Sequence, residues 1–168
     1  MQRTLAVSIL MILCGWSHAQ SDVYPNKPLR IVIPYPPGGG TDIVIRAVSG
    51  RLSERLGQPV VVDNRSGATG TIGSEAVARA APDGYTQFVS DNSTHTINPF
   101  HYKKLPYDPA KLAPVSLVAR SPLYLAAHSS FPPNTLAEAI ALLKANPGKF
   151  SYGSSGIGST HHLSMEFF

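Results

Sequence analysis

The sequence has one cysteine, Cys14, and one tryptophan, Trp16, and both fall within its first twenty residues. One thiol cannot form an internal disulfide, so the fold must depend on burial of apolar side chains. Charged residues are also few: the sequence has 14 Lys and Arg and 10 Asp and Glu, which gives a net charge of +4. The basic residues form no run and no stripe interleaved with aromatics. Nucleic-acid binding is therefore not indicated.

The start of the chain has the pattern of a secretory signal peptide. Arg3 is followed by an apolar run at residues 5–13 and by a small-x-small cleavage site at residues 17–19. The run is shorter than the about 20 residues needed to span a bilayer. A lipoprotein signal at Cys14 is the weaker alternative, because a bulky residue precedes it. We expect cleavage after Ala19 and a periplasmic or extracellular mature chain.

After this leader, compact apolar runs alternate with amphipathic segments. We predict, in order, a strand, a helix, a strand, a helix and a strand at residues 29–33, 43–56, 59–62, 74–81 and 85–90. Strands that alternate with helices pair in parallel through right-handed crossovers. The sequence thus predicts an α/β fold with a sheet covered on both faces.

The second half of the sequence is less regular. Residues 91–114 contain several prolines and predict mostly loop with one helical turn. Beyond them we predict two extended runs, a helix, a short strand and a final helix, at residues 115–119, 123–128, 136–145, 150–153 and from 161 onward. The helix at 136–145 is marked by a capping box, Thr135-x-x-Glu138, and by Asn-Pro-Gly at its end.

Four polar loops follow predicted strands. In a parallel sheet, ligands bind beyond the carboxyl ends of the strands. The loops there are rich in Gly, Ser, Thr or Asn and nearly free of charge: 34–41, 64–71, 91–96 and 154–160. Arg65 is the one residue in them that could pair with an acid directly, and such a side chain is more often solvated. The four loops together predict a ligand site at one edge of the sheet.

The first of these loops, within the segment PYPPGGGTD at 34–42, is the most informative one. Consecutive glycines allow a sharp turn, and the following helix offers unpaired N–H groups and its positive end. This arrangement suits a phosphate or a carboxylate. The alternative is a plain tight turn with Thr41 as N-cap, and Asp42 would partly neutralise the helix end. No Gly-Lys-Ser/Thr follows and the spacing is not G-x-G-x-x-G, so nucleotide binding is not indicated.

The fourth loop also follows a strand and opens a helix, and its alternative role is turn formation with capping by Ser159 or Thr160. Hydroxyls and backbone N–H groups from both loops could hold a carboxylate without a buried cation. The candidate ligand-binding residues are Gly38, Gly39, Gly40, Thr41, Ser93, Thr94, Ser154, Ser155, Gly156, Gly158, Ser159 and His161.

The histidines and serines raise the alternatives of a metal site or an enzyme. His161 and His162 are adjacent, so on a helix they diverge by about 100° and cannot readily chelate one ion. The other histidines lack metal-ligand spacing, and we expect no metal and no cofactor. The segment 153–156 is one residue short of G-x-S-x-G. A secreted α/β serine hydrolase that uses Ser154 or Ser155 stays as the alternative function.

An ordered series of motifs resembles the Bug family, which comprises periplasmic solute-binding proteins of tripartite tricarboxylate transporters. The motifs cover nearly all of the mature chain: YPxKP at 24–28, PYPPGGGTD at 34–42, NRxGA at 64–68, APDGY at 81–85, KLPYD at 104–108, PVSLV at 114–118 and YGSS at 152–155. The resemblance implies a type II periplasmic-binding fold, in which two lobes with mostly parallel sheets close on a small carboxylated solute.

The resemblance also implies a non-catalytic receptor that delivers an organic acid to membrane permease subunits. The acid's carboxylate would sit at the first glycine loop, held by backbone groups and water, and the fourth loop would contribute from the facing lobe. Residues 20–116 would form lobe 1, without its return segment, and residues 117–168 would begin lobe 2, after a signal peptide at 1–19.

Length is the one departure from this family, whose members run to roughly twice this length. The chain ends at Phe168, inside a predicted helix with aromatic surface left uncovered. We therefore expect a fragment of a longer receptor with an incomplete second lobe. A non-functional truncated product is the alternative.

Overall fold

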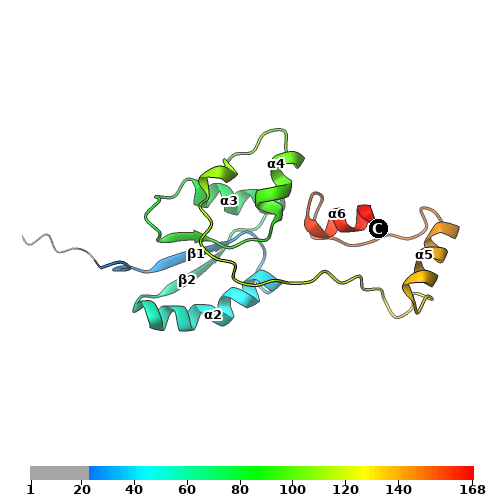
Figure 1. The fold of residues 1–168 in the computed structure, drawn as a ribbon, viewed down its shortest axis with the longest axis horizontal. Helices are drawn as coiled ribbons and strands as arrows, with labels where there is room; N and C mark the ends of the chain where they lie inside the picture. Colours follow the sequence, from blue (N-terminus) through cyan, green and yellow to red (C-terminus); the bar gives the residue numbers. More distant parts are fainter. Residues whose placement is uncertain (1–22) are drawn as a thin grey trace, which may run out of the picture.

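A computed structural model describes residues 23–168, so the predicted signal peptide and its cleavage site lie outside the described residues. Three strands form a parallel sheet in the order β2-β1-β3 (Figure 1). They are β1 (Leu29–Ile33), β2 (Val60–Asn64) and β3 (Thr86–Phe88). The predicted strands and their parallel pairing are confirmed, with β3 shorter than expected.

The central strand β1 carries the core. Leu29 pairs with Val60 and Ile33 with Asn64, while Arg30 pairs with Thr86 on the other side. Four of its five side chains are buried, which explains why it reads as a continuous apolar run instead of an alternating one. Arg30 N donates to the carbonyl of Tyr85 at 2.8 Å, and Val89 N donates to the carbonyl of Val32 at 3.0 Å, so the pairing with β1 extends one residue beyond each end of β3.

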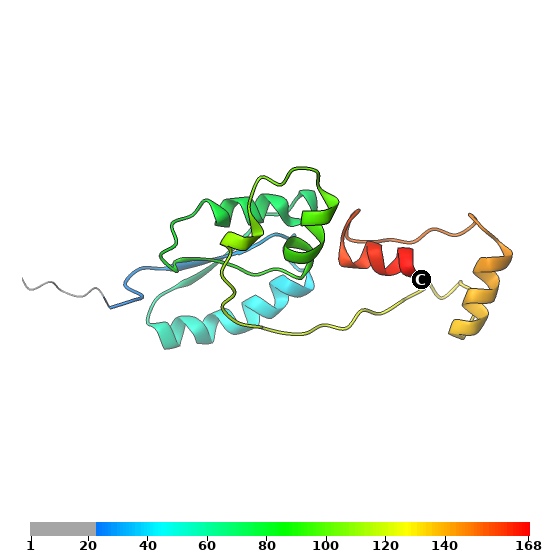
Figure 2. The same cartoon turned by 45° about the horizontal axis from the view of Figure 1, so that its top comes forward.

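Helices α2 (Gly40–Leu56) and α3 (Thr71–Ala78) lie on opposite sides of the sheet (Figures 1 and 2). Ile45 of α2 packs against Ile31 and Ile33. The helix ends where Gly57 adopts the left-handed conformation, with φ of 65°. Helix α3 begins and ends three residues earlier than predicted, so its expected bounds, 74–81, were wrong.

The segment between β3 and residue 114 is more helical than expected. It contains a π-helix, η3 (Ser93–Ile97), the short helix α4 (Asn98–His101) and a 3-10 turn, η4 (Pro109–Lys111). Buried Tyr107 donates a hydrogen bond of 2.7 Å from its hydroxyl to the backbone carbonyl of Thr94. This contact ties the segment after α4 back to η3, and composition alone did not indicate that this segment is ordered.

The two extended runs predicted at 115–119 and 123–128 do not become strands of the sheet. The backbone there is extended, but no strand of residues 23–168 pairs with it. Val115 is 84% exposed and Tyr124 86% exposed. These residues have β-forming side chains, but no neighbouring strand of the described residues supplies hydrogen bonds, and such a run becomes a strand only when it is paired. The short strand predicted at 150–153 is absent for the same reason.

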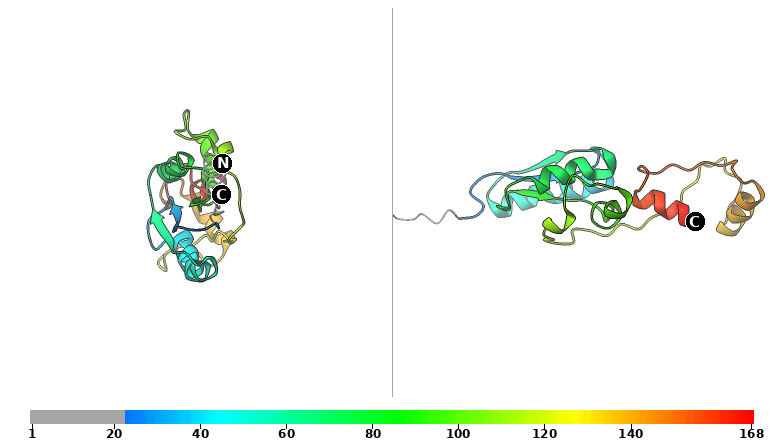
Figure 3. Two further views of the ribbon diagram at one scale, coloured as in Figure 1. Left: turned by 90° about the vertical axis from the view of Figure 1, so that its left-hand side faces the viewer. Right: turned by 90° about the horizontal axis from the view of Figure 1, so that it is seen from above.

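Two more helices complete the described chain. Helix α5 (Leu136–Ala145) has the predicted capping box, because the Thr135 hydroxyl accepts from Glu138 N at 3.2 Å. Helix α6 (Thr160–Phe167) is capped by Ser159, whose hydroxyl accepts from His162 N at 3.1 Å. The chain runs out to α5 and returns, so that α6 lies beside α4 (Figures 1 and 3). No helix among residues 23–168 is both long and apolar enough to cross a membrane.

Candidate functional site

The glycine turn ends at an uncapped helix terminus. Gly39 is the N-cap of α2, with φ of −72° and ψ of 164°, and no side chain of residues 23–168 caps this helix. Thr41 lies inside the helix, so the alternative in which Thr41 is the N-cap was wrong. Among residues 23–168, no hydrogen-bond acceptor meets the N–H groups of Gly40, Thr41 and Asp42. These donors point outward from the positive end of α2, where an anion would be stabilised.

Asp42 is buried beside this turn and does not face solvent. Its carboxylate accepts from Gly38 N at 2.9 Å, from Arg46 Nε at 3.0 Å and from Asn64 Nδ2 at 3.0 Å. The hydrogen bond from Arg46, then those from Gly38 and Asn64, lower the pKa of Asp42 from 3.8 to about 2. The carboxylate is therefore ionised at neutral pH and internally satisfied.

Tyr35 joins the first loop to the second and third. Its hydroxyl donates to Asp91 Oδ1 at 2.7 Å, and its carbonyl accepts from Asn64 Nδ2 at 3.1 Å. Burial, and then the hydrogen bond to Asp91, raise the pKa of the Tyr35 phenol. Asp91 Oδ1 also accepts from Ser93 N at 2.9 Å, which orients the start of η3. The three loops are thus cross-linked at one sheet edge.

The second loop holds strained backbone. Ala68 and Thr69 have φ of 47° and 50°, a left-handed conformation that is rare for residues with a Cβ. The strain is held by outside contacts, because Asn98 Nδ2 donates to the Thr69 carbonyl at 3.0 Å and the Tyr102 hydroxyl donates to the Ala68 carbonyl at 3.1 Å. Backbone strain of this kind tends to gather at binding sites.

The fourth loop makes direct contact with the second and third. The Thr160 hydroxyl donates to Asn92 Oδ1 at 3.0 Å and lies 3.0 Å from the Ser93 hydroxyl. The Thr69 hydroxyl donates to the carbonyl of Ile157 at 3.1 Å. Hydrogen bonds therefore join residues that are more than 60 positions apart in the chain, and the start of α6 is fixed against η3.

Gly158 allows this approach. Its φ is +80°, and a Cβ at this position would lie 2.7 Å from the His101 ring. Only glycine accepts both the backbone conformation and the contact without rearrangement.

The structure brings only some of the predicted site residues together. Ser93, Thr94, Gly158 and Ser159 are buried, and Ser93 contacts Thr160 at the seam between the third and fourth loops. The predicted residues that stay exposed are Gly38, Gly39, Gly40, Ser154, Ser155, Gly156 and His161, with Thr41 half-buried. Within the described part of the chain, no hydrogen bond links residues 38–41 to residues 154–161.

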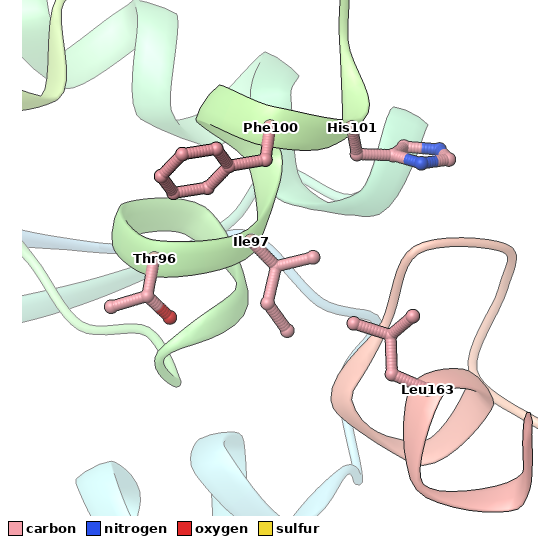
Figure 4. Close-up of a pocket in the computed structure, with 5 residues that line it drawn as sticks. All are labelled: Thr96, Ile97, Phe100, His101 and Leu163. Carbon is pink, nitrogen blue, oxygen red and sulfur yellow. The ribbon is translucent and has the colours of Figure 1, made fainter. Parts of the chain in front are cut away.

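A largely apolar hollow lies next to the seam (Figure 4). It measures about 290 Å³ and is lined by Thr96, Ile97, Phe100, His101 and Leu163. The side chains of Ile97 and Leu163 point toward one another across it, the first from η3 and the second from α6. A second hollow is lined by Ile140, Leu143, Lys144 and Phe168. Neither hollow is lined by the glycine turn.

Sequence reasoning missed several residues that build this site. They are Tyr35, Asn64, Thr69, Asn92, Asn98 and, as an inter-loop contact, Thr160. All lie in or beside the four polar loops, so their location could have marked them as candidates. Their hydrogen-bond partners are distant in sequence, however, and could not be found from the sequence. Residues 23–168 contain no group of three or more His, Cys, Asp or Glu side chains placed to hold a metal ion.

Comparison with known proteins gives consistent matches. A family model described as tripartite tricarboxylate transporter family receptor matches residues 44–168. Two relatives come from Bordetella pertussis: a UPF0065 protein, 39% identical over 95% of this chain, and protein BugT, 38% identical over 100%. The chain covers 50% and 53% of their lengths, so it spans about half of the curated relatives that it matches.

Solved structures agree with these matches. Rpa4515 of R. palustris, in complex with adipate, has a TM-score of 0.80 and 38% identity over 85% of this chain. MatC of Rhodopseudomonas palustris, with bound malate, has a TM-score of 0.74 and 34% identity over 82%. This chain covers 48% and 47% of those two chains.

Proposed function

The chain belongs to the tripartite tricarboxylate transporter receptor family, and from this premise we propose that it contributes half of a cleft that captures a small carboxylated solute. The resemblance to the Bug family is confirmed, as is the α/β fold of periplasmic binding proteins. The coverage of about half of each relative fits the expectation of an incomplete second lobe.

The uncapped start of α2 is the observation that carries this proposal. It presents the N–H groups of Gly40, Thr41 and Asp42 beside a glycine turn, and no acceptor side chain among residues 23–168 competes for them. Helices α5 and α6 are capped by Thr135 and Ser159, whereas α3 also begins without a side-chain cap among residues 23–168. Hydrogen bonds from backbone N–H groups to a carboxylate are charge-assisted and about twice as strong as neutral ones. Structural neighbours hold adipate and malate, which are both carboxylates.

The two lobes would close on the solute by a hinge motion. Residues 20–116 would form the lobe that carries the glycine turn, and residues 117–168 would begin the facing lobe. The exposed, extended segment 115–128 connects them and would act as the hinge region. The contacts of Thr160 with Asn92 and Ser93 support a role for the fourth loop as the opposing wall.

The proposal keeps the ligand-binding residues predicted from the sequence and gives them three different roles. Gly38 to Thr41 would bind the carboxylate, and the exposed residues of the fourth loop, Ser154, Ser155, Gly156 and His161, would contact the rest of the solute. Ser93, Thr94, Gly158 and Ser159, which are buried, would shape the cleft wall.

Family members are periplasmic binding proteins, so the same compartment is the natural setting for this chain. The finer points belong to the proposal: secretion through a signal peptide cleaved after Ala19, delivery of the solute to membrane permease subunits, and a role in binding without catalysis. Cleavage would be checked by sequencing the N-terminus of the exported protein.

Isothermal titration calorimetry tests the proposed function. The purified chain would be titrated with adipate and malate, and with adipamide as an uncharged control of matched length. We expect heat of binding with at least one acid, none with adipamide, and recovery of the acid unchanged. Absence of binding to any acid in a panel of mono-, di- and tricarboxylates would contradict the proposal.

One contact favours a second candidate, a serine hydrolase. The Ser155 hydroxyl lies 2.9 Å from His161 Nδ1, and both residues are exposed. No carboxylate among residues 23–168 bonds the other nitrogen of His161, so the third member of a catalytic triad is missing from this arrangement. Covalent labelling of Ser155 by a fluorophosphonate probe, lost on Ser155→Ala, would favour the hydrolase.

A further inference from the structure

We propose that Arg46 is a positioning residue for the solute site, which balances the charge of Asp42 so that this carboxylate can shape the glycine turn without repelling an anionic solute. The inference rests on the proposed function. It assigns to the Asp42–Arg46–Asn64 cluster a role in setting the affinity for anions at the start of α2.

The three side chains form a closed set of hydrogen bonds. Arg46 Nε lies 3.0 Å from both carboxylate oxygens of Asp42, and Arg46 Nη2 donates to Asn64 Oδ1 at 2.9 Å. Asn64 Nδ2 in turn donates to Asp42 Oδ1 at 3.0 Å and to the carbonyl of Tyr35 at 3.1 Å. The cluster connects α2, the end of β2 and the glycine turn.

Asp42 determines which backbone donors remain for a solute. It accepts the N–H of Gly38 at 2.9 Å, which holds that residue at φ of +84°. The turn therefore keeps one shape, and the N–H groups left without an acceptor among residues 23–168 are those of Gly40, Thr41 and Asp42 itself. A cleft in which donors are fixed in advance binds better than one that must order them.

The negative charge of the Asp42 carboxylate would by itself repel an anion at the start of α2. A negative charge in the first turn of a helix cancels much of the positive end of the helix dipole. Asp42 is 3% exposed, so water screens its charge poorly. Arg46 lies one turn further along the helix, and its guanidinium meets the carboxylate directly. The local charge of the pair is zero, and the start of α2 remains attractive to an anion.

This arrangement makes the effect of substitutions depend on charge as well as on contacts. Arg46→Gln keeps a polar side chain but leaves the Asp42 charge uncompensated beside the solute. Asp42→Asn combined with Arg46→Gln removes both charges and keeps groups that can hydrogen-bond to Gly38 and Asn64. A purely structural role for Arg46 predicts that the double variant is at least as impaired as the single one, whereas charge balance predicts rescue.

The experiment compares adipate affinity by calorimetry in the full chain and in three variants: Arg46→Gln, the Asp42→Asn/Arg46→Gln double variant, and Arg55→Gln. Arg55 lies in the last turn of α2 and is exposed, so Arg55→Gln matches the charge change far from the turn. Circular dichroism melts of each variant show whether the fold is retained.

We expect Arg46→Gln to weaken adipate binding by about three- to tenfold, with a steeper dependence on salt, since a charge near a helix end has effects of this order. The double variant should recover to within about threefold of the parent, and Arg55→Gln should change affinity by less than about twofold. Unchanged affinity in Arg46→Gln, or a double variant as weak as Arg46→Gln, would overturn the inference while the proposed function stands. No binding of any acid by the parent chain would overturn both.

Discussion

Substitution of Gly40 by proline isolates one backbone donor of the proposed carboxylate site. Gly40 is the first residue of α2, where proline is well tolerated because its N–H has no partner within the helix. The preceding residue, Gly39, has φ of −72° and ψ of 164°, an extended conformation of the kind that is favoured before proline. Apart from its chain neighbours and the backbone of α2, no atom of residues 23–168 lies within 4 Å of the place where a Cβ at residue 40 would sit. The change therefore removes an N–H and little else.

The expected loss follows from the strength of one charged hydrogen bond. Hydrogen bonds to charged groups contribute about 1.5 to 3 kcal/mol. Removal of the Gly40 N–H should therefore weaken carboxylate binding by roughly ten- to a hundredfold. Stability should change little, or rise by a few tenths of a kcal/mol, because proline restricts the unfolded chain.

The assay is calorimetric titration of adipate into the parent chain and the Gly40→Pro variant. Leu136→Pro is the matched control, because Leu136 is the first residue of α5, far from the turn, and follows Thr135 with φ of −131° and ψ of 156°. We expect the control to bind adipate as the parent does. Equal adipate affinity in Gly40→Pro and the parent would refute the assignment of the carboxylate to the start of α2.

Three further predictions concern the seam and the buried acid. Gly158→Ala places a methyl group against the His101 ring at a φ of +80°, so thermal melts should show that the free energy of unfolding falls by about 1 to 3 kcal/mol. Adding His101→Ala should restore only the part of this loss that comes from the clash with the ring. Thr160→Val removes side-chain contacts to Asn92 and Ser93 and should lose about 1 to 2 kcal/mol, whereas Thr160→Ser should lose less; equal losses would contradict the hydrogen-bonding role. The lowered pKa of Asp42 means that its contribution to stability is present above its ordinary pKa of 3.8 and is lost as pH falls toward about 2. Acid titration followed by circular dichroism should therefore show a shallower decline in Asp42→Asn over that range, and parallel curves would contradict the assignment.

Elements with strong local signals could be predicted from the sequence. The central strand β1 is a compact apolar run, and α5 is bracketed by a capping box and an Asn-Pro-Gly stop, so composition and spacing sufficed. The glycine turn before α2 was found in the same way. Parallel pairing followed from the alternation of strands and helices, which leaves few other topologies.

Features that depend on partners distant in sequence could not be predicted. Residues 115–128 have β-forming side chains, but a strand exists only where another strand supplies hydrogen bonds. The burial of Asp42 depends on Asn64, and the left-handed conformation of Thr69 depends on Asn98, 29 positions away. Asp42 was expected to weaken the anion site; its pairing with Arg46 is local, four residues along α2, and the i,i+4 spacing of opposite charges could have indicated it.

The most direct test of the central claim is a two-dimensional nitrogen–proton NMR titration of the labelled chain with adipate. The account predicts that the largest shifts occur at the amides of Gly40, Thr41 and Asp42, which have no acceptor in the structure described for residues 23–168. Shifts should be small at Leu136, at the start of α5. Adipate-dependent shifts confined to the hollow around Ile97 and Leu163, with none at the start of α2, would contradict the account.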